Sequence, residues 1–540
     1  MKKTRKTFLL ISTVMMLGLT LSGCNKQAGG DNVLDIFSTN AGYGIDWIKD
    51  MVKGFSNASW VKQKYPNLKI NFGNGDYDAS SSVGSKITAG TERVNKYDLL
   101  FSCNPCGDSF GSNINTSFYE ELSDVYNGAI PGEKEYDGSE GKMLKDKMNQ
   151  DVLSANQTRF PDGKDYYLTF PWIIGSEGII YNETKLSSYI SDFEKPRTTN
   201  ELNALVERLA TLMLADEDYP WVTLNGGDYN DGTLITWWAQ YEGVENYNLF
   251  FEGKNKEGEY TSDNFKQVGR LRALQALESL YQEDNIHPDS YLGVKKFMTI
   301  QNRFIRGIDG IFMFQGDWFE NENKESVTNQ VFNWMKTPIN STLVEKCDSL
   351  SNDEQLSFVI KCIDEGKDYE QSKAAFSYGD LSENDYEYLK NARSVEYMMY
   401  GHQAHIPNYA SGKEIAKDFL RYMATNEGIE IMIKAGKGYQ TAFDYQPDTS
   451  FINDNYSILQ KSRRNILETA TLLKPKSSWF LFNYGGLTPW KTLHPEQVLT
   501  ATLAKDRKTA QQIYDEEVEY YTKDGSANFK NILKQAGINL

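Results

Sequence analysis

The chain has 540 residues and a formal net charge of −17, with 57 Lys and Arg against 74 Asp and Glu. This length is enough for two to four domains of roughly 100 to 200 residues each, and the excess of negative charge argues against binding to the phosphate backbone of DNA or RNA. Aromatic residues make up 13% of the sequence, which predicts either a core rich in rings or rings that face a ligand.

The N-terminal segment has the composition of an export signal. A basic start is followed by an apolar run from Phe8 to Leu21, which is shorter than the ~20 residues that a membrane-spanning helix needs. The run closes with Leu21-Ser-Gly-Cys24, which resembles the lipobox of bacterial lipoproteins; the alternative is an ordinary signal peptide with an additional cysteine. We therefore expect a signal peptide over 1–23, a lipid on Cys24, a tether over 24–32, and a location on the outer face of the bacterial cytoplasmic membrane.

The chain without its signal segment is strongly acidic. Residues 1–23 hold four positive charges and no negative ones, so the formal charge without them is −21.

Four cysteines follow Cys24, and an even number of cysteines in an exported protein suggests disulfides. Three pairings are open, and the pairing of sequence neighbours joins Cys103 to Cys106 and Cys347 to Cys362. A loop around Pro105 argues against a redox motif, and the lack of a nearby histidine argues against zinc. We expect no cofactor and no metal ion.

The chain then shows alternating strand and helix patterns. Strand-like runs cover Val33–Phe37, Leu68–Phe72 and Tyr97–Ser102, and a helical stripe of apolar residues runs from Trp47 to Phe55. A second helix is expected to end near Gly90. This β-α-β-α-β order predicts an α/β lobe with a parallel sheet that is covered by helices.

The loops after these three strands are candidates for ligand contact, because ligands of parallel sheets sit at the carboxyl ends of the strands. The same residue types also occupy turns for conformational reasons alone. The candidate side chains in these loops are Asn40, Tyr43, Asp76 and Asn104.

Further elements follow in the middle of the chain. Gly178–Asn182 and Gly310–Phe314 are strand-like, and a long amphipathic helix is expected over 265–280. The segments 131–165 and 336–395 are more polar and lack clean periodicity, so we interpret them as insertions.

Three segments carry a resemblance to a known family. Residues 166–172 (YYLTFPW), followed by 178–186 (GIIYNETKL), resemble the first crossing between lobes in extracellular solute-binding proteins of bacterial ABC transporters, in their carbohydrate-type, family 1-like branch. Residues 304–318 resemble that branch's F-x-x-G, strand, G-x-W pattern. Residues 406–428 resemble its I-P-x-x-S to T-x-E-G helix. The three segments occur in the order found in the family.

This resemblance implies a two-lobed, periplasmic-binding-protein-like α/β fold of type II, with hinged lobes and a ligand cleft between them. The implied lobes are 33–170 plus 401–436 and 171–400 plus 437–540. The implied crossings between the lobes lie near 168–174, 398–404 and 436–440.

A sugar presents a face of C–H groups and an edge of hydroxyls, so its site needs flat rings and planar polar groups. Trp318 is the best candidate, because the matching Trp of the family commonly stacks on sugar, and Asp317 beside it is placed to reach hydroxyls. For each ring the alternative is a place in the core. The other ring candidates are Trp172, Tyr229, Tyr439 and Trp490.

The resemblance implies a monomeric lipoprotein that is not an enzyme. It would capture a neutral oligosaccharide by hinge closure and deliver it to the permease subunits of an ABC importer, with the lipid anchor as its link to the membrane and no nucleic-acid partner. One alternative is a receptor of the same fold for peptides or cationic solutes. Another is a surface glycoside hydrolase, with Asp317 and Glu320 as the paired carboxylates.

Overall fold

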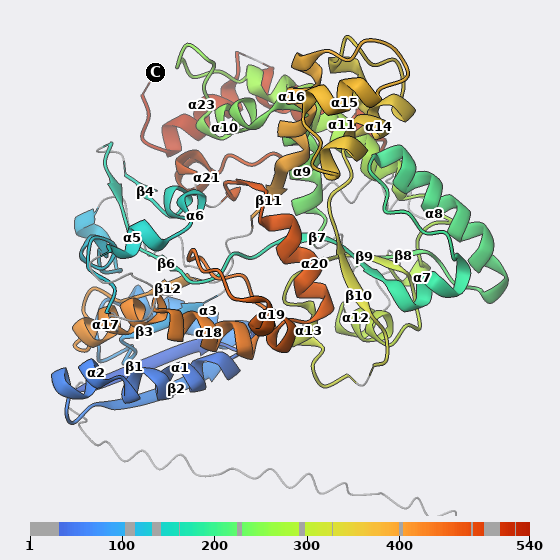
Figure 1. Ribbon diagram of the computed structural model, residues 1–540. Coiled ribbons are helices and arrows are strands. Elements are labelled where there is room, and N and C mark those ends of the chain that lie inside the picture. The colour runs from blue at the N-terminus through green and yellow to red at the C-terminus, as the bar shows by residue number, and fades with distance from the viewer. Residues whose placement is uncertain are drawn as a thin grey trace, which may run out of the picture.

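The computed structural model describes residues 32–102, 114–131, 142–160, 163–223, 229–290, 297–326, 328–398, 403–476, 479–490, 508–523 and 525–539. These residues form a mixed α/β molecule with two main sheets, which lie in different halves of the molecule (Figure 1). The predictions made for Cys24, Cys103, Asn104 and Cys106 lie outside the described residues.

The first half is built on a five-stranded sheet. Its strand order is β2 (Lys69–Gly75), β1 (Val33–Thr39), β3 (Leu99–Ser102), β12 (Gln403–His405) and β6 (Phe170–Pro171). Strand β1 pairs in parallel with β2 and β3, which confirms the parallel sheet predicted for the opening lobe. Strand β12 comes from much later in the sequence and pairs antiparallel with both β3 and β6.

Helices cover this sheet with the apolar stripes that the sequence predicts. Helix α1 (Asp46–Asn57) buries Trp47, Ile48, Met51 and Phe55, and it packs against α18 (Asn426–Ala435). The other helices and the hairpin of this half are α2 (Ser59–Lys64), α3 (Tyr77–Ile87), α4 (Ser123–Tyr126), α5 (Leu144–Lys147), α6 (Gln150–Ala155), α17 (Lys413–Met423), β4 (Thr158–Arg159) and β5 (Asp165–Tyr166).

The second half is built on a four-stranded sheet. Its strand order is β10 (Phe332–Met335), β7 (Glu177–Asn182), β9 (Phe312–Gly316) and β8 (Trp221–Val222). The predicted strands at 178–182 and 310–314 are confirmed as β7 and β9, with β9 shifted by two residues. Its helices are α7 (Glu183–Tyr189), α8 (Thr199–Met213), α9 (Asp231–Glu242), α10 (Val244–Glu252), α11 (Val268–Leu280), α12 (Phe297–Ile305), α13 (Phe319–Glu322), α20 (Ile458–Leu467), α21 (Phe480–Gly485), α22 (Ala510–Thr522) and α23 (Ala527–Gln535). Helix α19 (Thr449–Asn455) packs Phe451 and Ile452 against the core of the first half.

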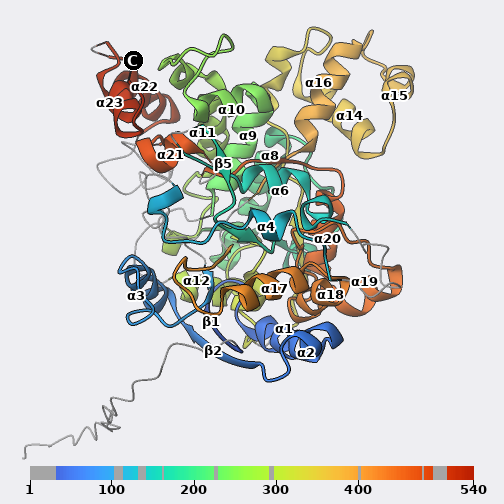
Figure 2. The ribbon, with the colours of Figure 1, turned by 90° about the vertical axis from the view of Figure 1, so that its left-hand side faces the viewer.

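The segment 336–395 forms a helical layer at the end of the second half that is far from β1 and β2, as both ribbon views show (Figures 1 and 2). It contains α14 (Asp353–Asp364), α15 (Tyr369–Ala375) and α16 (Glu383–Ser394), and it leads into β11 (Val395–Tyr397), which pairs with β13 (Thr471–Leu473). The expectation of no clean periodicity is wrong for α14. Leu356, Val359 and Ile360 lie on one face at helical spacing and are buried in a core that belongs to this layer.

Both described cysteines of the second half lie in this layer with free thiols, so the expected disulfide between Cys347 and Cys362 is wrong. Each thiol is buried instead, and Cys347 packs among the apolar side chains of the layer's core. Burial, with Asp385 and Asp348 nearby, raises the pKa of the Cys347 thiol to about 12. The reactive thiolate form is therefore disfavoured.

Two of the implied crossings lie side by side between the halves. Ile173 pairs antiparallel with Thr441, and the Ile174 amide donates to the carbonyl of Gln440 at 2.8 Å. The third implied crossing contains residues 399–402, which lie outside the described residues.

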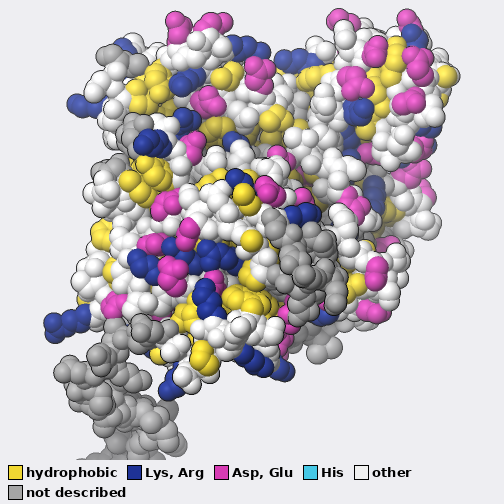
Figure 3. Space-filling view, turned by 60° about the vertical axis from the view of Figure 1, so that its left-hand side comes forward, with side chains coloured by type: hydrophobic (Ala, Val, Ile, Leu, Met, Phe, Trp, Pro, Cys, Tyr) yellow, Lys and Arg dark blue, Asp and Glu magenta, His cyan; other side chains and the backbone are white. Residues whose placement is uncertain are grey.

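Within the part of the chain that the structure describes, no helix combines the length and the apolar character needed to cross a bilayer. On the face shown in Figure 3, acidic and basic side chains are interspersed and hydrophobic side chains reach the surface in small patches.

Candidate functional site

Five of the predicted ring residues converge where the two halves meet, and we call this cluster the aromatic junction. Tyr43 follows β1 in the first half, and its ring centroid lies 4.8 Å from Tyr439, 5.6 Å from Trp318 and 5.8 Å from Trp172. Tyr229 completes the cluster, with its ring 5.5 Å from that of Trp318. All of these pairs meet edge to face, an arrangement that aromatic rings favour.

Four of these rings are shielded from water by one another. The exposed fractions are 1% for Trp172, 2% for Tyr439, 3% for Tyr43 and 4% for Trp318, and only Tyr229 is partly exposed. A ring needs a free face to stack on a sugar. In this structure the four rings instead fill the core between the halves, which is the alternative that the sequence left open for each of them.

The G-x-W motif has a packing explanation in the same place. The indole of Trp318 lies directly over Gly316 at the end of β9, where a Cβ atom would be only 2.2 Å from the ring. A glycine is therefore required two residues before this tryptophan.

Asp317 lies at the centre of the junction in a buried ion pair. Its side chain has no exposed surface, its Oδ2 lies 3.1 Å from a guanidinium nitrogen of Arg463, and its Oδ1 accepts the hydroxyl of Tyr43 at 2.6 Å. Burial raises the pKa of the Asp317 carboxyl, while Arg463 acts in the opposite direction. Glu320, its proposed partner in a hydrolase, accepts a hydrogen bond from Ser457 at 2.5 Å. Both carboxylates are thus engaged by protein groups.

A set of polar contacts beside the junction also joins the halves. The side-chain amide of Asn321 donates to the carbonyl of Gly42 at 2.5 Å, and Lys324 pairs with Asp46 at 2.6 Å. Gly44 has a positive φ of 66°, and a Cβ atom there would lie 2.8 Å from Asn321. The loop after β1 is therefore fitted closely against α13.

An ion pair lies two residues after Tyr229, the partly exposed ring of the junction. Asp231, at the start of α9, forms an ion pair with Lys476, and both retain exposed surface. A Cβ atom at Gly232 would lie 2.8 Å from the Cβ of Glu177, so this third charged side chain is close to the start of α9.

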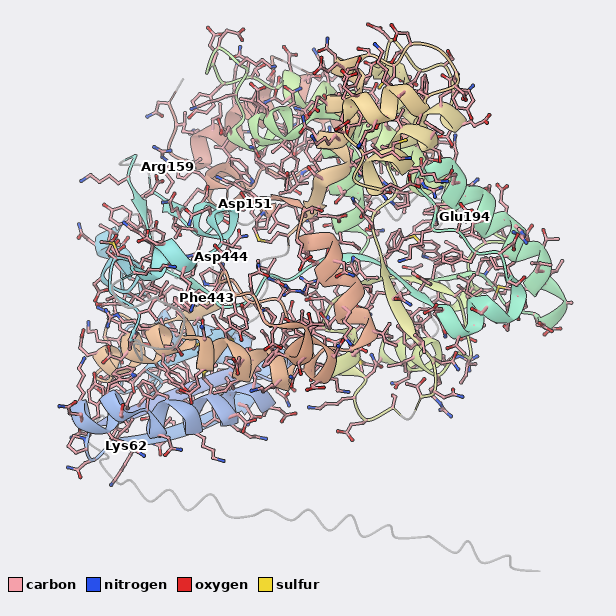
Figure 4. The ribbon with its side chains drawn as sticks, viewed as in Figure 1. Lys62, Asp151, Arg159, Glu194, Phe443 and Asp444 are labelled. Atoms are coloured by element: carbon pink, nitrogen blue, oxygen red, sulfur yellow. The ribbon has the colours of Figure 1, made fainter. Side chains whose placement is uncertain are left out.

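A groove between the halves presents rings that are not sealed, and we call it the aromatic groove. It has a volume of about 530 Å³ and is lined by the β4–β5 hairpin and α6 on one side and by α10, α21 and the segment after α23 on the other. Arg159, which is labelled in Figure 4, marks its wall in the first half. Its partly accessible rings are Phe480 and Tyr260, and Trp479 lines it with most of its surface buried.

The rings of the aromatic groove are backed by further rings. Trp479 stacks on buried Phe251 with 5.8 Å between centroids and 13° between planes, and Lys474 lies 5.4 Å from the Trp479 ring. On the opposite wall Phe160 is buried behind the surface. These residues belong to no motif that is recognisable in the sequence, although Trp479-Phe480-Leu-Phe482 is a dense aromatic run just before Trp490.

The remaining predicted residues lie elsewhere. Trp490 packs against Arg270, whose guanidinium carbon lies 4.8 Å from the ring centroid. Asn40 and Asp76 are exposed at the carboxyl ends of β1 and β2, where the Asn40 amide donates to the carbonyl of Gly75 at 2.7 Å.

The described residues contain one group with the composition of a metal site, formed by His287, Asp289 and Asp309. Arg303 forms an ion pair with Asp309 through two guanidinium nitrogens. Although burial alone would raise the pKa of Asp309, Arg303 and His287 lower it overall. The charge of Asp309 is therefore already balanced by a cationic side chain.

The comparisons with known proteins place the fold. No family model matches the chain, and no curated protein matches it in sequence. Among solved structures, RafE in complex with raffinose is 12% identical with a TM-score of 0.52, over 89% of this chain and 98% of that one. Maltose-bound MalE3 of T. maritima is 12% identical with a TM-score of 0.54, over 90% and 98%. The Thermus thermophilus maltotriose binding protein, bound with maltotriose, is 14% identical with a TM-score of 0.51, over 93% and 100%. Along about nine-tenths of its length, the chain thus has the two-lobed α/β fold of these sugar-binding proteins. This is the fold that the sequence predicts.

Proposed function

We propose that this chain is the substrate-binding protein of an ABC importer, anchored by a lipid on Cys24, and that it captures a neutral oligosaccharide between two lobes for delivery to the permease. The lobes would comprise 33–170 plus 401–436 and 171–400 plus 437–540. The fold similarity to proteins named for raffinose, maltose and maltotriose supports this proposal, as does the lipobox-like end of the signal segment.

The observation that carries the proposal is the aromatic groove, because it combines rings with polar groups contributed by both halves. Its volume of about 530 Å³ falls within the ~300 to 1,000 Å³ of ordinary ligand sites. Phe480 and Tyr260 offer ring surface for the C–H face of a sugar, while Gln157 and Arg159 can reach hydroxyls from the opposite wall.

Capture between the lobes follows from the position of the aromatic groove between the two halves. A ligand that touches both walls has more contacts when the walls are close together, and only such differential affinity can shift the population toward a closed state. The permease would then bind the closed form. The predicted ligand contact at Tyr229 remains part of the proposal, because Tyr229 is the partly exposed ring of the junction. The predicted contact at Trp318, which is buried here, would require the two halves to separate.

Calorimetry of the purified protein with raffinose, maltose, maltotriose and chitin oligosaccharides tests the proposal. Phe480→Ala should weaken binding of the preferred sugar by roughly 2- to 12-fold, since one aromatic contact contributes about 0.5 to 1.5 kcal/mol beyond its buried area. Tyr378→Ala is the matched control, because Tyr378 is an exposed ring on the helical layer and its loss should leave affinity unchanged.

Three results would contradict the proposal. New reducing ends during incubation would indicate a hydrolase, and binding of basic peptides in place of sugars would indicate the receptor for peptides or cationic solutes. Equal affinity of the wild type and Phe480→Ala for the same sugar would remove the aromatic groove as its site.

A further inference from the structure

A second and larger groove lies away from both the aromatic junction and the aromatic groove. Its volume is about 1080 Å³, and its walls are the segment before α8, the end of β10, helices α14 and α16, and helix α20. Glu194, which is labelled in Figure 4, marks its end next to α8. The helical layer 336–395 forms one complete wall, so this groove exists only because that layer is present.

The charge of this groove is opposite to that of the chain. Seven of its lining residues are Lys or Arg and three are Asp or Glu, whereas the whole chain has a formal charge of −17. We therefore call it the cationic groove. A local excess of one sign inside a concave surface concentrates ions of the opposite sign.

Two of the cations hold the floor of the groove in place. Arg393 is buried, and its guanidinium donates to both carboxylate oxygens of Asp364 at 2.9 and 2.8 Å and to the carbonyl of Thr337 at 2.8 Å. Lys336 lies 3.3 Å from the same carboxylate. The carboxyl of Glu396 also faces these two cations; it accepts from the Thr337 hydroxyl at 3.3 Å, and burial raises its pKa to about 7. Arg393 and Lys336 thus share the carboxylate of Asp364, so the floor holds two cations around one carboxylate.

Three other cations are available to a ligand. Lys195 precedes α8, Lys361 lies on α14 and Lys461 lies on α20, so they approach the groove from three walls. Among the residues that the structure describes, none of the three has a carboxylate within ion-pair distance. A ligand that lies along the groove would therefore meet ammonium groups that are not held in an ion pair.

The other residues that line the cationic groove limit the kinds of ligand that it can bind. The lining residues that the structure describes include no aromatic ring, so there is no platform for a sugar face or a nucleobase. Asn465 is exposed between the cations and can donate a hydrogen bond, whereas Asn333 and Ser462 already donate to Glu183 and to the carbonyl of Leu459. Lysines act as point charges toward phosphate oxygens, which accept several charge-assisted hydrogen bonds at once.

We propose that the cationic groove is a second binding site, for a ligand that carries several phosphate groups. Free polyphosphate and the phosphate headgroups of an anionic lipid surface share this chemistry. The site is independent of the oligosaccharide site, because the two grooves share no lining residue.

The test is calorimetric titration of the purified protein with tripolyphosphate, at low salt and at about 0.15 M salt. Lys361→Glu with Lys461→Glu should weaken binding at least tenfold, and binding to the wild type should weaken as salt rises because these charges are partly exposed. The matched control is Lys53→Glu with Lys62→Glu, which makes the same charge change on exposed positions of α1 and α2 in the first half. Lys62 is labelled at the opposite side of the molecule in Figure 4.

Vesicles of phosphatidylglycerol, compared with vesicles of phosphatidylcholine, identify the source of the phosphate. Loss of vesicle binding in the groove variant alone supports the headgroup, whereas binding of tripolyphosphate without binding of vesicles supports a free ligand. The proposal is overturned if tripolyphosphate does not bind, if both double variants weaken it equally, or if a sulfated oligosaccharide binds more tightly. An unchanged melting temperature and unchanged sugar affinity in the groove variant confirm that it is folded.

Discussion

The aromatic junction and the aromatic groove contain the same kinds of side chain but differ in their access to water. Both contain tyrosine and tryptophan, and both are formed by residues from the two halves. In the junction the rings cover one another and enclose the pair of Asp317 with Arg463. In the groove Phe480 and Tyr260 keep exposed surface, while the rings behind them are buried. The type of residue therefore does not determine which ring can bind a ligand. A ring can bind a ligand only when no second ring covers its face.

This difference separates two kinds of effect. Changes inside the junction should act on the free energy of unfolding, because they remove buried contacts or leave buried charge. Changes on the open surface of the groove should act on ligand affinity with little effect on stability.

The largest effect is expected beneath the wall of the aromatic groove, at His405. Its imidazole is buried in β12 and stacks on Tyr119, which belongs to the same core as Phe160. Burial lowers its pKa from 6.5 to about 3. The unfolded chain therefore takes up a proton as pH falls below about 6.5 while the folded chain does not, so stability present above that pH is lost progressively toward pH 3. This shift corresponds to about 5 kcal/mol in total.

Urea unfolding at neutral and acidic pH measures this dependence. Replacing His405 with glutamine should make the decline in unfolding free energy between about pH 6 and pH 4 shallower. Other titrating groups contribute equally to both proteins and cancel in the comparison. Parallel declines for the wild type and the variant would show that His405 does not remain neutral in the folded chain.

Asp317→Ala should cause the next largest loss. It would leave the Arg463 guanidinium, which is 1% exposed, without its partner, and breaking a buried pair in this way costs about 3 to 5 kcal/mol. The double variant Asp317→Leu with Arg463→Met removes both charges and should be more stable than the single variant. A single variant with the stability of the wild type would mean that water reaches Arg463 and that the junction is not sealed.

Tyr43→Phe removes a single hydroxyl from the junction. The hydrogen bond to Asp317 is 2.6 Å long and buried, and hydrogen bonds to charged groups contribute about 1.5 to 3 kcal/mol. Tyr378→Phe is the control, since Tyr378 makes the same type of bond to Glu354 at 2.8 Å on the surface. Its loss should not be measurable in urea unfolding. Similar losses in the two variants would contradict the contrast between sealed and open regions.

The parts of the fold that the sequence predicts correctly are those with a strong local pattern. The apolar stripe from Trp47 to Phe55 is buried as α1, and the three opening strands pair in parallel. The helices of 336–395 were missed because many charged residues obscure the stripe of Leu356, Val359 and Ile360. The pairing of Cys347 with Cys362 was inferred from sequence proximity, and proximity does not require that two cysteines face each other.

The sequence also predicts that several site residues lie close together, but it does not predict whether they are exposed to water. Trp172, Trp318 and Tyr439 lie on or beside the family-like segments, and the structure brings them together. Whether each ring is covered depends on Tyr43, which lies far away in the sequence, so no local pattern reports it. Phe480 and Tyr260 belong to no recognised motif, and only the approach of the two halves places them around one groove.

The smallest effect is expected for the exposed pair between the halves, Asp46 and Lys324. Their side chains are 55% and 40% exposed at a separation of 2.6 Å, so their coupling in a double-mutant cycle with Asp46→Asn and Lys324→Met should be about 0.2 to 1 kcal/mol. Because the pair exists only when the halves are together, its loss should weaken the affinity for a ligand that touches both halves by no more than roughly 5-fold. Calorimetry with the preferred sugar measures this change. If affinity falls while the unfolding free energy stays the same, the surface contacts help to set the position of the lobes. If neither quantity changes, the buried contacts of the aromatic junction alone hold the halves together, and the exposed pair contributes nothing to ligand affinity.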